Sequence, residues 1–150
     1  MTGSCSLTDS MTYTPERRNV RRARRRVAAL VIEWGHPGAA GDAALIAGEL
    51  AANALLHGRV AGRMFRVEVF LDAKVLRVAV TDARGERLPE QREAGVEEQC
   101  GRGLAIVDAL AARWGVEPLV VGKRVWAELD VDAAANDVAV HSAVPAAGEG

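Results

Sequence analysis

The sequence predicts an α+β fold, a two-layer sandwich in which helices cover one face of a mainly antiparallel β-sheet. Three observations favour this fold. Two segments with helical spacing come first, the strand-like segments that follow stand in adjacent pairs, and strands do not alternate with helices in the βαβ manner. The 150 residues, 49% of them hydrophobic, are enough for one domain with a core and too few for two.

The first expected helix follows Thr14 and Pro15, a capping residue and a proline suited to the first helical position. Apolar residues then recur at helical spacing as far as Trp34, and Gly35 ends the run. The other faces of this helix carry seven arginines within residues 17–26. Such a face is typical of a solvated helix surface, which we favour, and also of a surface that grips an acidic partner or nucleic acid.

A second helix is expected to start with Asp42 as its cap, after a Pro/Gly-rich loop over residues 36–41, and to end at Gly58. Residues 65–71 and 76–80 then place apolar side chains at every second position on either side of a short polar turn. This period is typical of an antiparallel hairpin.

Residues 83–102 show no sustained period, and a loop of this length inside a compact domain is usually functional or mobile. A third helix is expected from residue 104 to Gly115, followed by a second hairpin around Gly122. Residues 133–150 are rich in alanine and glycine and are expected to form a loosely ordered tail. For residues 1–14 an N-terminal extension and an edge strand are both left open.

Charge and cysteine content point to a soluble cytoplasmic protein. The 19 basic and 20 acidic residues give a net charge of −1, so no global field draws the chain to nucleic acid or a membrane. Cys5 and Cys100 follow no metal or disulfide pattern and read as free thiols. No apolar run approaches the roughly 20 residues that cross a bilayer, so no membrane contact is expected.

The second helix carries the first candidate site. Glu49, Asn53 and His57 lie four residues apart and share one helix face. Asparagine is a poor helix former, and Gly48 costs about 1 kcal/mol relative to alanine, so both suggest a functional position. The amide oxygen of Asn53 suits Mg²⁺, and Glu49 could activate an attacking hydroxyl or water. Taken alone, the pattern is also typical of a solvated polar face.

Two further segments carry candidate residues. Asp82 ends a strand, where its carboxylate could accept a hydrogen bond from an exocyclic amine such as that of adenine, and Gly85 could let a base approach the backbone. Gly101 and Gly103 open a helix whose exposed amides and dipole favour phosphate, and Arg102 stands between them. Each feature alone is also typical of an ordinary turn.

In this order and spacing the segments together resemble the GHKL ATPases, which include histidine kinases, gyrase-type topoisomerases and mismatch-repair ATPases. ELAANALLHG (49–58) is similar to the asparagine box of the family. VAVTDARGERLP (78–89) is similar to its first glycine box and GRGLAIVDALAARWG (101–115) to its second. The resemblance covers about residues 15–131 and is strongest for the small single-domain branch, which contains the anti-sigma-factor serine kinases and related ATP-binding regulators of actinobacteria.

The resemblance implies a Bergerat fold over residues 15–132, with ATP held between helices and sheet under a lid at residues 86–100. By matching position, Asn53 would hold Mg²⁺, Glu49 would be the catalytic base and Asp82 would read the adenine. Other nucleotide contacts would come from His57, Gly85, Gly101, Arg102, Gly103 and Leu104.

Three residues depart from the family pattern. Arg84 and Glu86 occupy two glycine positions of the first glycine box. Arg124 stands where a threonine or serine is common, and this change would remove a hydrogen bond on the adenine side of the pocket.

The function implied by the resemblance is that of an ATP- and Mg²⁺-dependent regulator, an anti-sigma-factor-type serine/threonine kinase. Its partners would be a STAS-type antagonist protein, a sigma factor or both, and a homodimer is left open. The alternative is a module of the same fold without catalysis, which binds nucleotide or sequesters a partner. Direct nucleic-acid binding is not expected, because no aromatic residues are interleaved with the arginines of the first helix.

Overall fold

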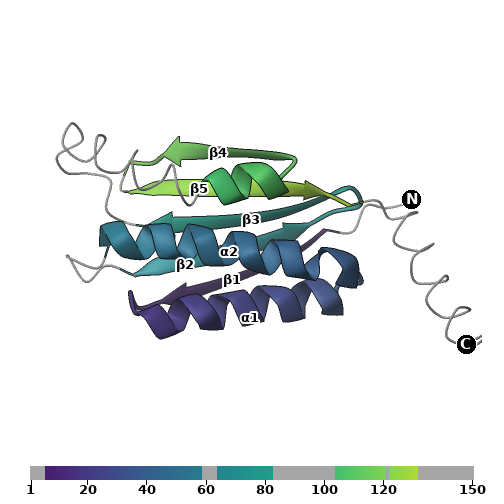
Figure 1. The fold of residues 1–150 in the computed structure, drawn as a ribbon, viewed down its shortest axis with the longest axis horizontal. Coiled ribbons are helices and arrows are strands. Elements are labelled where there is room, and N and C mark those ends of the chain that lie inside the picture. Colours follow the sequence, from purple (N-terminus) through teal and green to yellow (C-terminus); the bar gives the residue numbers. More distant parts are fainter. Residues whose placement is uncertain (1–5, 59–63, 83–103, 121, 132–150) are drawn as a thin grey trace, which may run out of the picture.

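The computed structural model describes residues 6–58, 64–82, 104–120 and 122–131. One antiparallel sheet has the strand order β1-β2-β3-β5-β4, and α1 and α2 lie side by side over one of its faces (Figure 1). This arrangement confirms the predicted α+β sandwich. The elements are β1 (Leu7–Tyr13), α1 (Arg17–Glu33), α2 (Pro37–Gly58), β2 (Phe65–Leu71), β3 (Val75–Asp82), β4 (Arg113–Pro118) and β5 (Lys123–Asp130), and residues 104–110 are also helical.

The core lies between the two layers, and alternation along the strands builds it. Every second residue of β2 from Phe65 to Leu71 is buried, and antiparallel pairing sets these residues opposite the buried positions of β3. On the helix side α1 contributes Ala23, Val27 and Val31, which are spaced by four residues. α2 packs along α1 and, among the strands, chiefly on β3, so it lies over the middle of the sheet.

Both predicted hairpins are present. Asp72 closes the β2–β3 turn, where its carboxylate accepts the backbone N–H groups of Lys74 and Val75, each at 2.8 Å. The β4–β5 turn contains Gly122, whose φ of 88° is the left-handed conformation that glycine adopts without strain. Gly35, with a φ of 98°, ends α1 as predicted.

The predicted start of the first helix is wrong. α1 begins at Arg17 with Glu16 in the cap position, and no side chain caps it. Instead, the amide of Asn19 donates hydrogen bonds to the carbonyl and the hydroxyl oxygen of Thr14, at 2.9 and 2.8 Å. Thr14, which precedes α1, is therefore hydrogen-bonded to the first turn of the helix.

Two more predicted boundaries are wrong. The segment expected as a Pro/Gly loop over 36–41 is helical from Pro37 onward, because Pro37 occupies the first helical position, where its missing N–H costs nothing. The third helix stops at residue 110, and Trp114 and Gly115 belong to β4. Gly115 lies under the indole of Trp126, which explains a glycine in a strand: an added Cβ would meet the ring at 2.9 Å.

The expectation that no apolar run could span a membrane also needs correction. Pro37–Leu56 of α2 is long and apolar enough by length and composition, although half of it is buried inside the domain. That burial is typical of a core helix. The predicted tail over 133–150 and the predicted lid over 86–100 lie outside the described residues.

Candidate functional site

A buried polar pair marks the boundary between α2 and the sheet. Asn53 continues the buried stripe of Ile46 and Leu50, and Asp82 continues that of Val78 and Val80. Both side chains therefore face the interface of the two layers. Each is almost fully buried, with 6% of Asn53 and 3% of Asp82 exposed. Burial of these two groups inside an apolar layer distinguishes them from a solvated polar face.

Connectivity brings Asn53 and Asp82 to the same end of the domain. Asp82 pairs with Phe65 of β2, and Phe65 pairs with Tyr13 of β1, so these residues share one end of the sheet. α1 starts next to that end and runs away from it, and α2 returns antiparallel after a short turn (Figure 1). The C-terminal half of α2, which carries Asn53, therefore lies at the Asp82 end.

Glu49 lies one turn before Asn53 on α2 and is partly exposed. Its carboxylate is therefore nearer to solvent than the amide of Asn53. A general base must be accessible to the hydroxyl group from which it takes a proton. His57 is the third residue of this series; it lies within α2, but its side chain is outside the described part of the structure.

Gly48 has a packing role that the sequence did not reveal. The side chain of Arg24 from α1 crosses over it, and an added Cβ at Gly48 would lie 2.6 Å from Cδ of Arg24. The glycine thus admits the arginine between the helices. Because packing against Arg24 explains the glycine, its cost to helix stability does not indicate a binding site.

Lys123 is a residue that sequence analysis missed. It is the first residue of β5 and lies directly opposite Asp82 in the sheet register, so both side chains project from the same face. A lysine is thereby placed next to the carboxylate predicted to read the adenine. Only the strand register identifies Lys123 as the neighbour of Asp82. The hairpin pattern in the sequence does not give this register, because it does not show that β5 pairs with β3.

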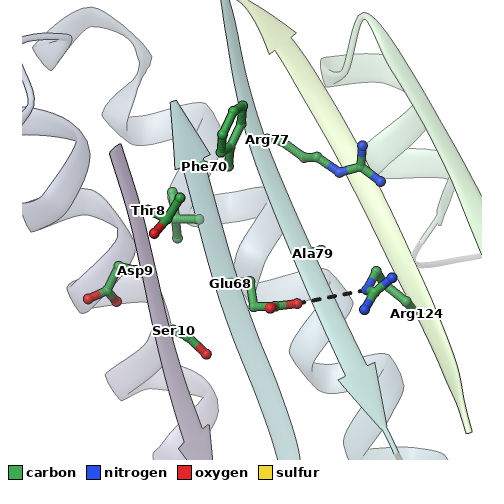
Figure 2. Close-up of a pocket in the computed structure, with 9 residues that line it drawn as sticks. Thr8, Asp9, Ser10, Glu68, Phe70, Arg77, Ala79 and Arg124 are labelled. Atoms are coloured by element: carbon green, nitrogen blue, oxygen red, sulfur yellow. Dashed lines mark ion pairs between the residues drawn. The ribbon is translucent and has the colours of Figure 1, made fainter. Parts of the chain in front are cut away.

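Arg124 lies on the opposite face of the sheet, away from the helices. It stands across from Thr81 and forms ion pairs with Glu117 at 2.9 Å and Glu68 at 3.8 Å. Figure 2 shows Arg124 and Glu68 facing each other across β3 above Ala79. The expectation that Arg124 removes a hydrogen bond from the adenine side is therefore wrong, because its neighbour Lys123 occupies the site-facing position.

The outer face also holds a hollow of about 380 Å³ above Ala79, separate from the Asn53–Asp82 end of the helix interface (Figure 2). Its walls include Glu68, Phe70, Arg77 and Arg124. Arg77 stacks 4.6 Å from the ring centre of Trp126 and pairs with Glu128, so its charge is compensated locally. Of the predicted site residues whose side chains the structure describes, none lines this hollow.

The predicted phosphate-binding segment is only partly described. Gly85, Gly101, Arg102 and Gly103 lie outside the described residues. Leu104 is buried and contributes to the core, and it begins the helical residues 104–110. The backbone that follows the two glycines is therefore packed against the same core as α2.

The donor set fits Mg²⁺ bound to a nucleotide. The described residues contain no group of three His, Cys, Asp or Glu side chains that would hold a metal by themselves. Mg²⁺ commonly keeps waters and phosphate oxygens and takes only one or two protein ligands. A single amide oxygen from Asn53 is compatible with that chemistry, and the acceptor-only carboxylate of Asp82 is compatible with an adenine amino group.

The described residues thus form a two-layer α+β sandwich with a buried amide on α2 and a buried carboxylate at a strand end. The family model of the histidine kinase-like ATPase domain matches residues 13–128. No curated protein sequence matches the chain. The protein belongs to the histidine kinase-like ATPase domain family, which confirms the GHKL resemblance and implies ATP binding, typically with Mg²⁺.

Proposed function

We propose that the protein is a cytoplasmic, ATP- and Mg²⁺-dependent regulator that acts as an anti-sigma-factor-type serine/threonine kinase. Its substrate would be a hydroxyl group on a STAS-type antagonist protein, and the partner that it sequesters would be a sigma factor. The observation that carries the proposal is the burial of Asn53 and Asp82 at one end of the helix–sheet interface. Membership of the ATPase family supports the nucleotide, and the partly exposed Glu49 supports the transfer step.

In the proposed mechanism the chain supplies position and charge. Asn53 would hold Mg²⁺, which neutralises the phosphates when bound, and Asp82 would accept a hydrogen bond from the adenine amino group. Glu49 would accept the proton of the attacking hydroxyl. Because Glu49 and Asn53 are one turn apart on a single helix, base and metal ligand would keep a fixed spacing.

ATP binding is tested by calorimetric titration with Mg-ATP. The parent chain is expected to bind, and Asn53→Ala is expected to bind at least about tenfold more weakly because it lacks the metal ligand, a loss of about 1.4 kcal/mol in binding free energy. Asn19→Ala provides a matched control, because Asn19 is also a buried asparagine and bonds to Thr14. Equal affinity of the parent and Asn53→Ala would refute the role of Asn53.

Transfer is tested with labelled ATP and a STAS-domain protein. Glu49→Ala is expected to retain Mg-ATP binding and to lose phosphate incorporation by a factor of about 10² or more. Glu49→Gln tests whether the proton-accepting charge is required. The second candidate, a module without catalysis, is favoured if Mg-ATP binds and no phosphate is transferred by the parent. The departures at Arg84 and Glu86 are the observation that keeps this candidate open.

A further inference from the structure

The outer edge of β1 is an open strand edge. β1 is the first strand in the sheet order and pairs with β2 alone among the described strands. Its sequence LTDSMTY contains no proline and no lysine, the residues that commonly protect an edge from pairing. The single charged side chain, Asp9, is engaged by Arg26 through two hydrogen bonds of 2.9 and 2.7 Å. Among the described residues, nothing pairs with the outer edge of β1.

A groove of about 450 Å³ runs beside this edge, between β1 and α1. It is lined by residues 11–14 and by Asn19, Arg22 and Arg26 of the helix. Met11 is 36% exposed, which leaves an apolar surface at the groove. The groove thus places an apolar contact and arginine side chains beside a backbone edge. In β-strand addition the edge supplies the main-chain hydrogen bonds, and neighbouring side chains select the segment that binds.

The charge of α1 is unfavourable for the helix itself. Seven arginines stand in its first ten residues, and no acidic residue stands in the first turn. Positive charge near a helix N-terminus opposes the helix dipole, and like charges three or four residues apart repel each other. Ion-pair partners are described for Arg18 and Arg26; in the part of the chain that the structure describes, Arg22 has no acid within 4 Å. Such a cluster is relieved when an anionic partner binds.

We propose that the edge of β1 and the groove beside α1 bind an extended acidic segment of a partner protein. The segment would add a sixth strand to the sheet, with an acidic side chain against Arg22 and an apolar one against Met11. Guanidinium groups bind carboxylates in a two-pronged geometry, which selects acidic side chains. The inference does not depend on nucleotide binding or on phosphate transfer.

Two other occupants fit less well. A second copy pairing through β1 would bring the arginine-rich helices of both copies toward one another, and like-charge contacts oppose association. Nucleic acid cannot add a hydrogen-bonded strand to a sheet edge. Tyr13 is the aromatic residue in the groove, and it is already stacked on Phe65 at 5.4 Å. Burial raises the pKa of its hydroxyl, in agreement with a ring that is packed and not offered for base stacking.

The test measures fluorescence anisotropy of the full chain with a labelled nine-residue peptide that alternates valine or threonine with glutamate. The same peptide with lysine in place of glutamate is expected to bind at least about tenfold more weakly. Two further peptides carry N-methyl groups on alternate amides, one set for each edge of the strand. The proposal expects one of these peptides to lose binding and the other to keep it, because only one edge can pair with β1.

The matched variants are Arg22→Glu and Arg25→Glu, two exposed positions of the same helix, of which only Arg22 lines the groove. Arg22→Glu is expected to weaken binding of the glutamate peptide about tenfold or more, and Arg25→Glu less than about threefold, because the charge of Arg25 acts only at a screened distance. Asn53→Ala should leave peptide binding unchanged, which separates this proposal from that of ATP binding.

Several results would overturn the proposal: equal binding of the glutamate and lysine peptides, retention of binding by both N-methylated peptides, or equal effects of the two arginine variants. Stronger competition by a 20-base-pair DNA duplex than by the unlabelled glutamate peptide would assign the surface to nucleic acid. A dimer in sedimentation experiments that does not bind the glutamate peptide would assign the edge to a second copy.

Discussion

The side chain of Arg24 on α1 lies across Gly48 on α2, so closely that a Cβ at Gly48 would meet Cδ of Arg24 at 2.6 Å. We expect Gly48→Ala to change the free energy of unfolding by less than about 1 kcal/mol, because the gain in helix propensity is offset by displacement of the arginine. In an Arg24→Ala background the same substitution should stabilise the protein by about 1 kcal/mol.

Urea unfolding of the four proteins in this double-mutant cycle measures the coupling. Equal effects of Gly48→Ala in both backgrounds would show that the two residues do not interact. Affinity for Mg-ATP should be unaffected by Gly48→Ala, since packing between the helices accounts for this glycine. A large loss of affinity would instead assign Gly48 to the nucleotide site.

For Arg124 the sequence pattern and the structure predict different effects on ATP binding. Its side chain is on the outer face of the sheet, paired with Glu117 and Glu68. Arg124→Thr restores the residue type common in the family, yet we expect the dissociation constant for Mg-ATP to stay within about twofold. The loss of exposed ion pairs should cost at most about 1 kcal/mol in unfolding free energy. Tighter ATP binding by Arg124→Thr in calorimetry would contradict this placement.

The core strands were predictable from their period of two, because every second residue of β2 is buried. A shift of the strand by one residue would expose all of these apolar side chains to solvent. For β1 the pattern was not decisive, and an edge strand and an N-terminal extension both remained open. As an edge strand it is largely exposed on both faces, so LTDSMTY has no alternation to detect. Trp114 was assigned to a helix because its spacing from Val107 and Ala111 is helical, and the pairing of β4 with β5 that ends the helix cannot be read from that spacing.

The part of the candidate site that depends on residue type alone was predictable. Asn53 and Asp82 break the apolar patterns of their elements, and the structure brings both to one end of the helix–sheet interface. Lys123 was not predictable, because which of two adjacent residues faces Asp82 depends on register, and a shift of one residue exchanges Lys123 with Arg124.

Asp82 leads to a prediction about base selectivity. A carboxylate accepts hydrogen bonds and does not donate them, so it should favour the amino group of adenine and repel the carbonyl oxygen of guanine. Asp82→Asn adds a donor and removes the charge. We expect it to lower the affinity for ATP about tenfold and to narrow the preference for ATP over GTP, measured by competitive titration. Asp130→Asn, at the far end of β5, is the control; an equal effect there would contradict the role of Asp82.

The β2–β3 turn should make stability depend on pH. The carboxylate of Asp72 accepts the backbone N–H groups of Lys74 and Val75, and these hydrogen bonds lower its pKa below the ordinary value. A folded-state pKa that lies below the unfolded value means that the stabilisation is fully present above the unfolded pKa of about 4 and is lost as the pH falls through the folded pKa.

We therefore expect Asp72→Ala to lower the free energy of unfolding by about 1 kcal/mol at pH 7, measured by urea unfolding. The difference from the parent should stay constant between about pH 5 and pH 8 and should shrink steadily below about pH 4. Asp72→Asn keeps an acceptor oxygen but has no charge to titrate, so its unfolding free energy should approach that of the parent at low pH. A difference that widens as the pH falls would show that the turn is not held by the ionised carboxylate.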